Sequence, residues 1–584
     1  MAAASAKQLI LAPWDMERIR QLELEIAEVP SIRPDVRKKV TNYLMKQEIW
    51  HISDIDYELR KRYECYVAQH IPKATRHLYI TALDRLKQYA IQKSMKTLPG
   101  RVACQWQYED RIFFIPYHPD EAVEKAFDSV RGNPNMVWDF SVSCSRHLKQ
   151  QIFLVLNSIL KMDQPSRLRE YRLTGLQYLF QFCAERNVDD LEKLEQNQIA
   201  EFGKFLSENI ANTQKVQKIS GILDYSRKQI FLSGKMIHWN ANVWYLERFH
   251  FPEEKLNLSG PIKTISFLDV TQKENREVLQ AYMKYELGVS EDAVSVAEDR
   301  FYHIRDFLVA LEKLNCSVLD CTEEQIELYL KELQEKEISA KTFNIYISRL
   351  VHFYSFLAAH GYPVRIPFEP AYYTKKEVPI HHDRSVPEQI SREILEKLGN
   401  FPEHLRIMFL HVWGTGLRIS EVCSLKGKSY YRQGKDGWIQ VYQIKMKCYK
   451  RIPIPDALYQ IVMVYRKRHG IGPEDFLFQN QDGGAFSYST FMDQMKKCCE
   501  ENQIQNGMYL FRSHDYRHTI ATLFYDEHVS VQAIRDYLGH ENEEMTKQYL
   551  DYMPRKVAKA NDAFFHKKGN SLLSVSRERR GHGT

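Results

Sequence analysis

The chain has 584 residues, too many for one domain, and this length predicts about three to five domains. Apolar residues make up 44% and charged residues 27% of the sequence, which is typical of soluble globular domains and excludes a chain too polar to form a core. The net charge of +6 is compatible with a nucleic-acid partner but does not establish one, because many basic enzymes bind no DNA.

Several functional classes find no support in the sequence. The ten cysteines include no Cys-x-x-Cys pair, which favours reduced, mostly buried thiols in a cytosolic protein. The N-terminus has no cationic segment followed by a long apolar core, and no apolar run approaches the roughly 20 residues of a membrane span. A Gly-x-x-x-x-Gly-Lys-Ser/Thr loop is also absent, so ATP use is not indicated. We therefore expect a cytoplasmic protein without a membrane partner.

The N-terminal part reads as helices. Ile52, Ile55, Leu59 and Tyr63 recur at helical spacing, and Ala74-Thr75 marks the start of a second helix. Between residues 96 and 135, breakers such as Pro99-Gly100 and Gly132-Asn133-Pro134 predict a junction. We assign residues 1–135 to a first helical module.

A similar pattern recurs twice downstream. Helix starts at Thr75, Thr213 and Thr342 are separated by 138 and 129 residues, which suggests three related modules in tandem. The alternative is that any two-helix hairpin gives this pattern, and the sequence leaves both readings open. Five prolines between residues 361 and 387 then predict an extended interdomain linker.

The C-terminal third contains the residues that suit chemistry on a phosphodiester. His514 and Arg517 are three apart, so a helix places them on one face. Leu538-Gly539-His540 ends a second helix, with the glycine as its break, and Tyr549 follows. A planar cation, two imidazoles and a phenol can hold a phosphate, shift protons and supply an oxygen nucleophile.

These motifs resemble those of tyrosine recombinases of the phage-integrase type, including large transposon-encoded transposases. The family pattern is His-x-x-Arg, then Leu-Gly-His, then a tyrosine nine residues after that histidine. An upstream arginine box is matched by Thr415 to Val422, which contains Arg418. The family's Lys-x-x-Lys-x-Arg-x-Val-Pro-Ile-Pro run resembles Lys445 to Pro455.

The lysine register within that run has two solutions. Lys450 stands at the arginine position and Cys448 departs from the second lysine, which places the catalytic lysine at Lys445. Lys447 is the alternative, because the glycine that usually follows the lysine is missing. A strand-like run from Trp438 to Ile444 puts both lysines on a predicted β-hairpin.

The resemblance implies a mainly α multidomain fold, with helical N-terminal modules and an α+β catalytic domain that carries a small β-hairpin sheet. It assigns residues 263–375 to a core-binding, SAM-like DNA-binding domain and residues 384–560 to the catalytic domain. The remaining expected segments are a second helical module, a linker and a C-terminal tail, at 136–262, 376–383 and 561–584. The implied partner is double-stranded DNA, bound by a homotetramer on two duplexes at the nucleoid, with accessory recombination proteins left open.

The resemblance also implies a role for each site residue. Arg418 and Arg517 grip the non-bridging oxygens of the scissile phosphate. Tyr549 attacks phosphorus and leaves a 3′-phosphotyrosyl link, while Lys445 protonates the departing 5′ oxygen. His514 and His540 handle the proton of the nucleophile and hydrogen-bond the phosphate. No metal or cofactor enters this scheme. Tyr552 competes with Tyr549 but lacks the spacing from His540, and His518 is assigned a structural role.

The expected function is that of a site-specific DNA recombinase or transposase that integrates or excises a mobile element. One alternative is a zinc helix, in which His514 and His518 stand at i and i+4 with His540 as a third ligand. That alternative leaves Arg418 and Tyr549 unexplained. A type IB topoisomerase, or a catalytically silent DNA-binding accessory protein, would share part of the pattern.

Overall fold

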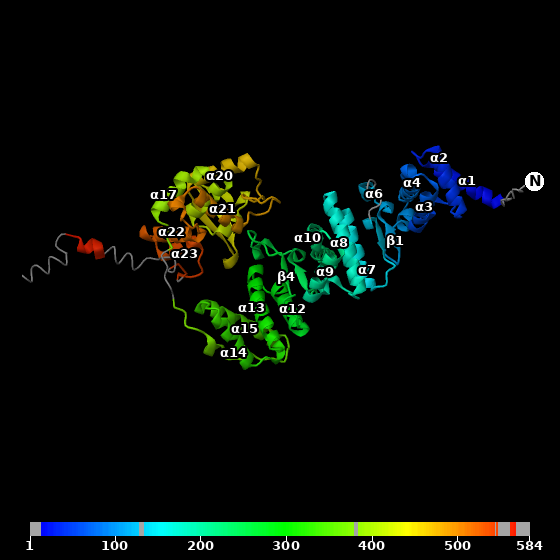
Figure 1. Cartoon of the computed structure of the whole chain (residues 1–584). Coiled ribbons are helices and arrows are strands. Elements are labelled where there is room, and N and C mark those ends of the chain that lie inside the picture. The colour runs from blue at the N-terminus through cyan, green and yellow to red at the C-terminus, as the bar shows by residue number, and fades with distance from the viewer. Residues whose placement is uncertain (1–12, 128–133, 379–383, 544, 547–560, 568–584) are drawn as a thin grey trace, which may run out of the picture. The chain divides into compact units, whose positions relative to one another are not determined.

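The chain folds into two compact units, which comprise residues 1–245 and 246–584 (Figure 1). The structure is a computed structural model, and it describes residues 13–127, 134–378, 384–543, 545–546 and 561–567. Residues 246–262, which the sequence assigns to the second helical module, fall in the second unit. The other module boundaries stay predictions.

The first unit contains two apolar cores. Helices α1 to α4 enclose the first core, and their bounds are Pro13–Glu28, Pro34–Lys46, Tyr57–His70 and Arg76–Ser94. The second core lies among α7 to α11, which span Arg146–Lys161, Ser166–Glu185, Gln196–Asn209, Thr213–Ser220 and Ile222–Ser233. The short helices α5 (Leu98–Ala103) and α6 (Glu121–Phe127) lie between these groups in the chain, and β3 (Val243–Tyr245) ends the unit.

A strand within the junction predicted at residues 96–135 pairs with a strand just after it. Strand β1 (Ile112–Phe114) pairs antiparallel with β2 (Val137–Asp139). Next to it, Arg60 donates to the buried carboxylate of Asp84 at 2.7 Å, and the Tyr117 hydroxyl donates to the same carboxylate at 2.9 Å. Burial of this charge is tolerated because it is paired and hydrogen-bonded.

The three predicted modules share one order of secondary-structure elements. Each has a 3-10 turn followed by two helices: η1 (Ile52–Asp54) before α3 and α4, η5 (Leu191–Lys193) before α9 and α10, and η8 (Val318–Asp320) before α14 (Glu323–Glu335) and α15 (Ala340–Ala359). This shared order does not distinguish a true repeat from a common hairpin, so the tandem repeat stays a prediction.

The second unit begins with the 3-10 turns η6 (Leu246–Phe249) and η7 (Glu253–Lys255), followed by β4 (Thr264–Ser266) and a helical group, α12 to α16. The first two of these helices are α12 (Lys273–Gly288) and α13 (Val294–Lys313), and after α14 and α15 comes the short α16 (Pro370–Tyr373). Residues 384 onward form the part with the site motifs. Its helices are α17 (Glu388–Lys397), α18 (Glu403–Thr415), α19 (Ile419–Cys423), α20 (Asp456–His469), α21 (Tyr488–Glu501), α22 (Ser513–Asp526) and α23 (Val531–Leu538).

A three-stranded antiparallel sheet lies within this last part. Its order is β5 (Tyr430–Gln433), β6 (Asp436–Gln443) and β7 (Cys448–Ile454), with Gln443 opposite Cys448 at the end of the β6–β7 hairpin. Alternate side chains of β6 are buried, namely Ile439, Val441 and Gln443, which is the period of a strand with one face on the core. The predicted mainly α fold with a small β-hairpin sheet is thereby confirmed.

Every helix in the described ranges is too short or too polar to span a lipid bilayer.

Candidate active site

Two helices of the second unit carry the C-terminal motifs. Helix α22 carries His514 and Arg517 on its first turns, and Arg517 is buried with 1% of its surface exposed. Helix α23 ends at Leu538, and Gly539 adopts the left-handed conformation at φ 67°. The left-handed conformation favours glycine at position 539, and a Cβ there would also force the end of the Gln443 side chain to shift.

The carbonyl oxygen of Leu538 is where the separate motifs meet. The Arg517 Nη2 group donates to this oxygen, as do Lys450 Nζ at 3.4 Å and Gln443 Nε2 at 3.5 Å. The Nη1 group of Arg517 donates to the Gly416 carbonyl at 2.9 Å. Arg517 therefore joins the end of α23 to the turn that precedes Arg418.

Glu421 connects Arg418 to the same network. Its carboxylate accepts from the Arg418 backbone N–H at 3.0 Å, from Arg418 Nη1 at 2.9 Å and from Gln443 Nε2 at 3.0 Å. Burial raises the pKa of the Glu421 carboxyl, but the charges of Lys450, Arg418 and Arg517 outweigh this effect and hold it below its usual value. Glu421 is thus a buried anion that fixes the first arginine.

Lys450 is the buried lysine of the β6–β7 hairpin, with 6% of its surface exposed. Desolvation lowers the pKa of its amine to about 7; Glu421 opposes this effect, and Arg517 and Arg418 add to it. An amine in this state exchanges its proton near neutral pH.

Lys445 and Lys447 lie elsewhere on the hairpin. Lys445 is exposed on the 3-10 turn Ile444–Met446, and none of the network hydrogen bonds found in the described residues involves it. Lys447 is exposed, has a left-handed φ of 50°, and places its Nζ 3.4 Å from the Asp292 carboxylate. Of the three lysines, Lys450 is the one that the described structure brings to the arginines.

Both candidate histidines have a lowered pKa. Desolvation, with the positive charges of Arg517 and Arg418, lowers the pKa of the buried His540 to about 3. Its Nδ1 lies 2.9 Å from the Thr546 hydroxyl. Desolvation, with the charges of His518 and Arg517, lowers the pKa of His514 to about 4, although that side chain is still exposed.

Tyr549 and Tyr552 lie outside the residues that the structure describes.

The zinc-helix alternative gains no support: among the described side chains, no group of three His, Cys, Asp or Glu has metal-binding geometry. His514 and His518 instead make an edge-to-face ring contact at 5.3 Å.

Three members of the network were not among the predicted site residues, namely Glu421, Gln443 and Lys450. Glu421 carried a signal, because a glutamate at the third position of a helix can accept from the N-cap backbone N–H, and Glu421 does so here from Arg418 at 3.0 Å. Lys450 lies in the hairpin motif, but at the position where the family pattern has an arginine and not the catalytic lysine. Gln443 is an unremarked strand residue, and only the fold shows that it bridges Glu421 and Leu538.

Known protein families match the part of the chain that carries the site motifs and a segment that precedes it. Residues 386–555 match the model of the phage integrase family, and residues 301–361 match that of the phage integrase N-terminal SAM-like domain. Transposase B from transposon Tn554 of Staphylococcus aureus is 27% identical over 352 residues, 58% of this chain and 55% of the transposase. Tyrosine recombinase XerC of Halalkalibacterium halodurans is 25% identical over 286 residues, 46% of this chain and 89% of the recombinase.

Among solved structures, the XerH site-specific recombinase bound to a palindromic difH substrate is 16% identical, with a TM-score of 0.36, covering 49% of this chain and 88% of that chain. The Tn1549 transposon integrase in complex with transposon right end DNA is 17% identical, with a TM-score of 0.36. The match covers 49% of this chain and 98% of the integrase chain. The chain spans about half the length of the transposase that it matches. The family resemblance carried by the motifs is confirmed over these parts of the chain: residues 386–555 match the phage integrase family, and the relatives over this region are a transposase and a tyrosine recombinase.

Proposed function

We propose that this protein is a site-specific DNA recombinase or transposase that cleaves and rejoins DNA strands through a 3′-phosphotyrosyl intermediate. The observation that supports this most directly is the network around Glu421 and the Leu538 carbonyl. It joins Arg418 and Arg517, which come from two separate family motifs. Two guanidinium groups fixed in this way are suited to the non-bridging oxygens of one phosphate.

In the proposed reaction, the Tyr549 phenol oxygen attacks the scissile phosphorus while the bond from phosphorus to the 5′ oxygen breaks. Arg418 and Arg517 stabilise the charge of the five-coordinate transition state. The proton of the phenol passes to a neutral imidazole, for which His514 and His540 are the candidates. Rejoining reverses the step and requires no nucleotide, because the phosphotyrosyl bond retains the energy of the broken ester.

The departing 5′ oxygen requires a proton, and Lys445 is the proposed donor. Its place on the exposed hairpin turn lets it reach a bound duplex. Lys447, at the same turn, remains the alternative. Lys450 donates to the Leu538 carbonyl within the network, and this contact is the role proposed for it.

Duplex DNA is the proposed substrate, and a tetramer on two duplexes is the proposed active assembly. Relatives that are a transposase and a tyrosine recombinase support strand exchange over a type IB topoisomerase or a silent accessory protein. The proposed biological role is integration or excision of a mobile element.

The experiment that tests this function does not require the DNA site to be known beforehand. Cells express the parent chain, the Tyr549→Phe variant or the Tyr552→Phe variant, and DNA that stays attached to protein after denaturation is captured and sequenced. We expect attached DNA with one recurrent sequence from the parent and from Tyr552→Phe, and none from Tyr549→Phe. Attachment that survives in Tyr549→Phe and is lost in Tyr552→Phe would assign the nucleophile to Tyr552.

A further inference from the structure

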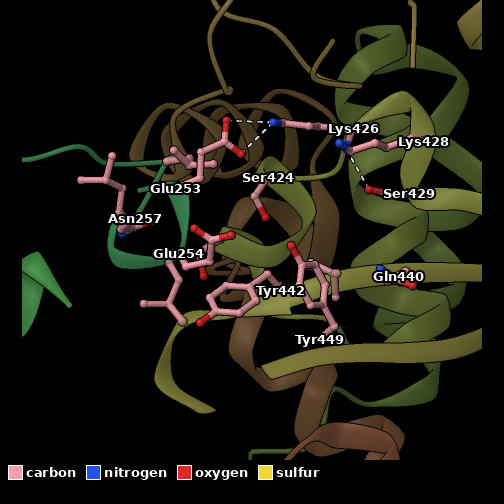
Figure 2. Close-up of a pocket in the computed structure, with 15 residues that line it drawn as sticks. Glu253, Glu254, Asn257, Ser424, Lys426, Lys428, Ser429, Gln440, Tyr442 and Tyr449 are labelled. Atoms are coloured by element: carbon pink, nitrogen blue, oxygen red, sulfur yellow. Dashed lines mark hydrogen bonds and ion pairs between the residues drawn. The ribbon is translucent and has the colours of Figure 1, made fainter. Parts of the chain in front are cut away.

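An acidic segment ahead of the helical group, residues 252–260, lies against the part of the second unit that carries the arginines; we call it the acidic strap. Both carboxylate oxygens of Glu253 contact Lys426 Nζ, at 2.8 and 2.7 Å (Figure 2). The Lys426 side chain is 16% exposed, and its Nζ also lies 5.2 Å from the centre of the Phe476 ring. The ion pair is therefore partly shielded from water.

Two further contacts hold the strap. The Tyr488 backbone N–H donates to the Ser259 carbonyl at 3.1 Å, and Ser259 is buried. At Gly260 a Cβ would lie 2.9 Å from the Tyr488 ring, so the close approach requires glycine. On its other side, Lys255 Nζ donates to the Ser290 carbonyl, between α12 and α13, at 2.7 Å.

The strap borders a cavity whose opposite wall carries hydrogen-bond donors. Ser424, Lys426 and Tyr442 line this wall (Figure 2), and Ser420 also lines the cavity. We call these four residues the donor face. Ser420 belongs to α19, the helix that begins directly after Arg418, so the donor face adjoins the proposed active site. Burial, followed by the charge of Glu254, raises the pKa of the Tyr442 phenol, which keeps this group a donor.

The Lys426 ammonium, the Ser420 hydroxyl and the Tyr442 phenol can donate to the oxygens of a backbone phosphate, whereas the Ser424 hydroxyl donates to the Glu421 carbonyl at 2.9 Å. Phosphate contacts supply a large share of the affinity of proteins for DNA. A glutamate can take the place of a phosphate at a lysine, because its two carboxylate oxygens are also hydrogen-bond acceptors. Glu253 takes that place at Lys426, on a strap that is exposed at this residue.

We propose that the donor face binds a phosphate of the DNA backbone outside the scissile position, and that Glu253 covers Lys426 until DNA displaces the acidic strap. The proposal rests on the proposed function for its partner, duplex DNA. An ion pair with one exposed partner, as Glu253 is here, is partly screened by salt, whereas a lysine–phosphate contact also releases a counterion from DNA. The exchange of Glu253 for a phosphate is therefore favourable at moderate salt.

Binding of a fluorescent duplex of random sequence tests the proposal, with the full chain carrying Tyr549→Phe so that no covalent step contributes. We expect Glu253→Gln to bind about threefold or more tightly than this reference, because Lys426 is released for a phosphate. Glu274→Gln is the matched control, since Glu274 is an exposed acid of the same unit on α12 and its loss changes the net charge equally. Glu274→Gln should stay close to the reference.

Lys426 must be the residue through which the gain arises. Lys426→Gln should weaken binding and make the dependence of log affinity on log salt shallower by about one. The double variant Glu253→Gln/Lys426→Gln should bind like Lys426→Gln alone. A gain that persists in the double variant overturns the proposal, as does a Glu253→Gln variant that binds no more tightly than Glu274→Gln.

Failure of the proposed function gives a different result. A chain that binds no duplex overturns both proposals. A chain that yields Tyr549-dependent adducts, but whose affinity is unchanged by Glu253→Gln, keeps the recombinase function and shows the strap to be a fixed structural element. A chain that shows the Lys426-dependent gain without adducts keeps the strap exchange and overturns the strand cleavage.

Discussion

Arg517 and Lys450 share one acceptor, the carbonyl oxygen of Leu538 at the end of α23. Arg517 is a predicted phosphate ligand. Lys450 lies on the β6–β7 hairpin and was not among the catalytic residues predicted from the motifs. Two cationic side chains that converge on a buried carbonyl repel each other, and this repulsion contributes to the lowered pKa of Lys450.

The stability of the chain should therefore depend on pH through Lys450. Its pKa is lowered from 10.5 to about 7 in the folded state, so between these values the unfolded chain binds more protons than the folded chain. The free energy of unfolding of the parent, relative to Lys450→Met, should rise as pH increases from about 7 to about 10 and should be flat below about 7. Thermal unfolding of both proteins over this pH range measures the difference. A constant difference would show that Lys450 stays charged.

Replacement of the bridging 5′ oxygen by sulfur should identify the general acid. A thiolate leaves without a proton, so Lys445→Ala should cleave ordinary DNA about 10²- to 10⁴-fold more slowly than the parent but cleave the sulfur substrate almost as fast. Arg418→Ala should stay slow on both substrates, because it acts on the non-bridging oxygens. Rescue of Lys447→Ala or Lys450→Ala, with Lys445→Ala still inactive, would move the assignment to that lysine.

Loss of the Glu421 carboxylate should damage both stability and cleavage. Glu421→Ala leaves Arg418 and Lys450 without their buried counter-charge, and removal of one partner of a buried ion pair costs about 3–5 kcal/mol. We expect a lower unfolding temperature and a slower rate of adduct formation, with Glu274→Gln unchanged in both assays. Wild-type stability in Glu421→Ala would contradict the network described above.

The second unit should retain the chemistry without the first. All described members of the network, and the acidic strap, lie within residues 246–584. A chain that begins at residue 246 should therefore form the covalent adduct on a minimal site. Its binding to a longer site should have a shallower salt dependence if the first unit contacts phosphates. Equal salt slopes for the two chains would show that the first unit does not touch the backbone.

Much of the fold and of the site could be predicted from the sequence, for identifiable reasons. The left-handed turn at Gly539 and the helix that places His514 and Arg517 on one side are local features, set by residue type and by the helical period. Gln443 and Lys450 could not be assigned in this way. Their importance depends on the pairing of β6 with β7 and on the approach of α23, and no local pattern encodes such contacts.

The C-terminal end of α23 also holds the candidate site in order while no ligand is bound. A helix C-terminus has a partial negative charge from its unpaired carbonyls, and at Leu538 this charge faces Arg517, Lys450 and Gln443. It acts as a built-in counter-ion for Arg517, while Glu421 does the same for Arg418. Both guanidinium groups are thereby held in place in the unbound chain, so the phosphate proposed as their ligand need not order them, and less conformational entropy is lost on binding.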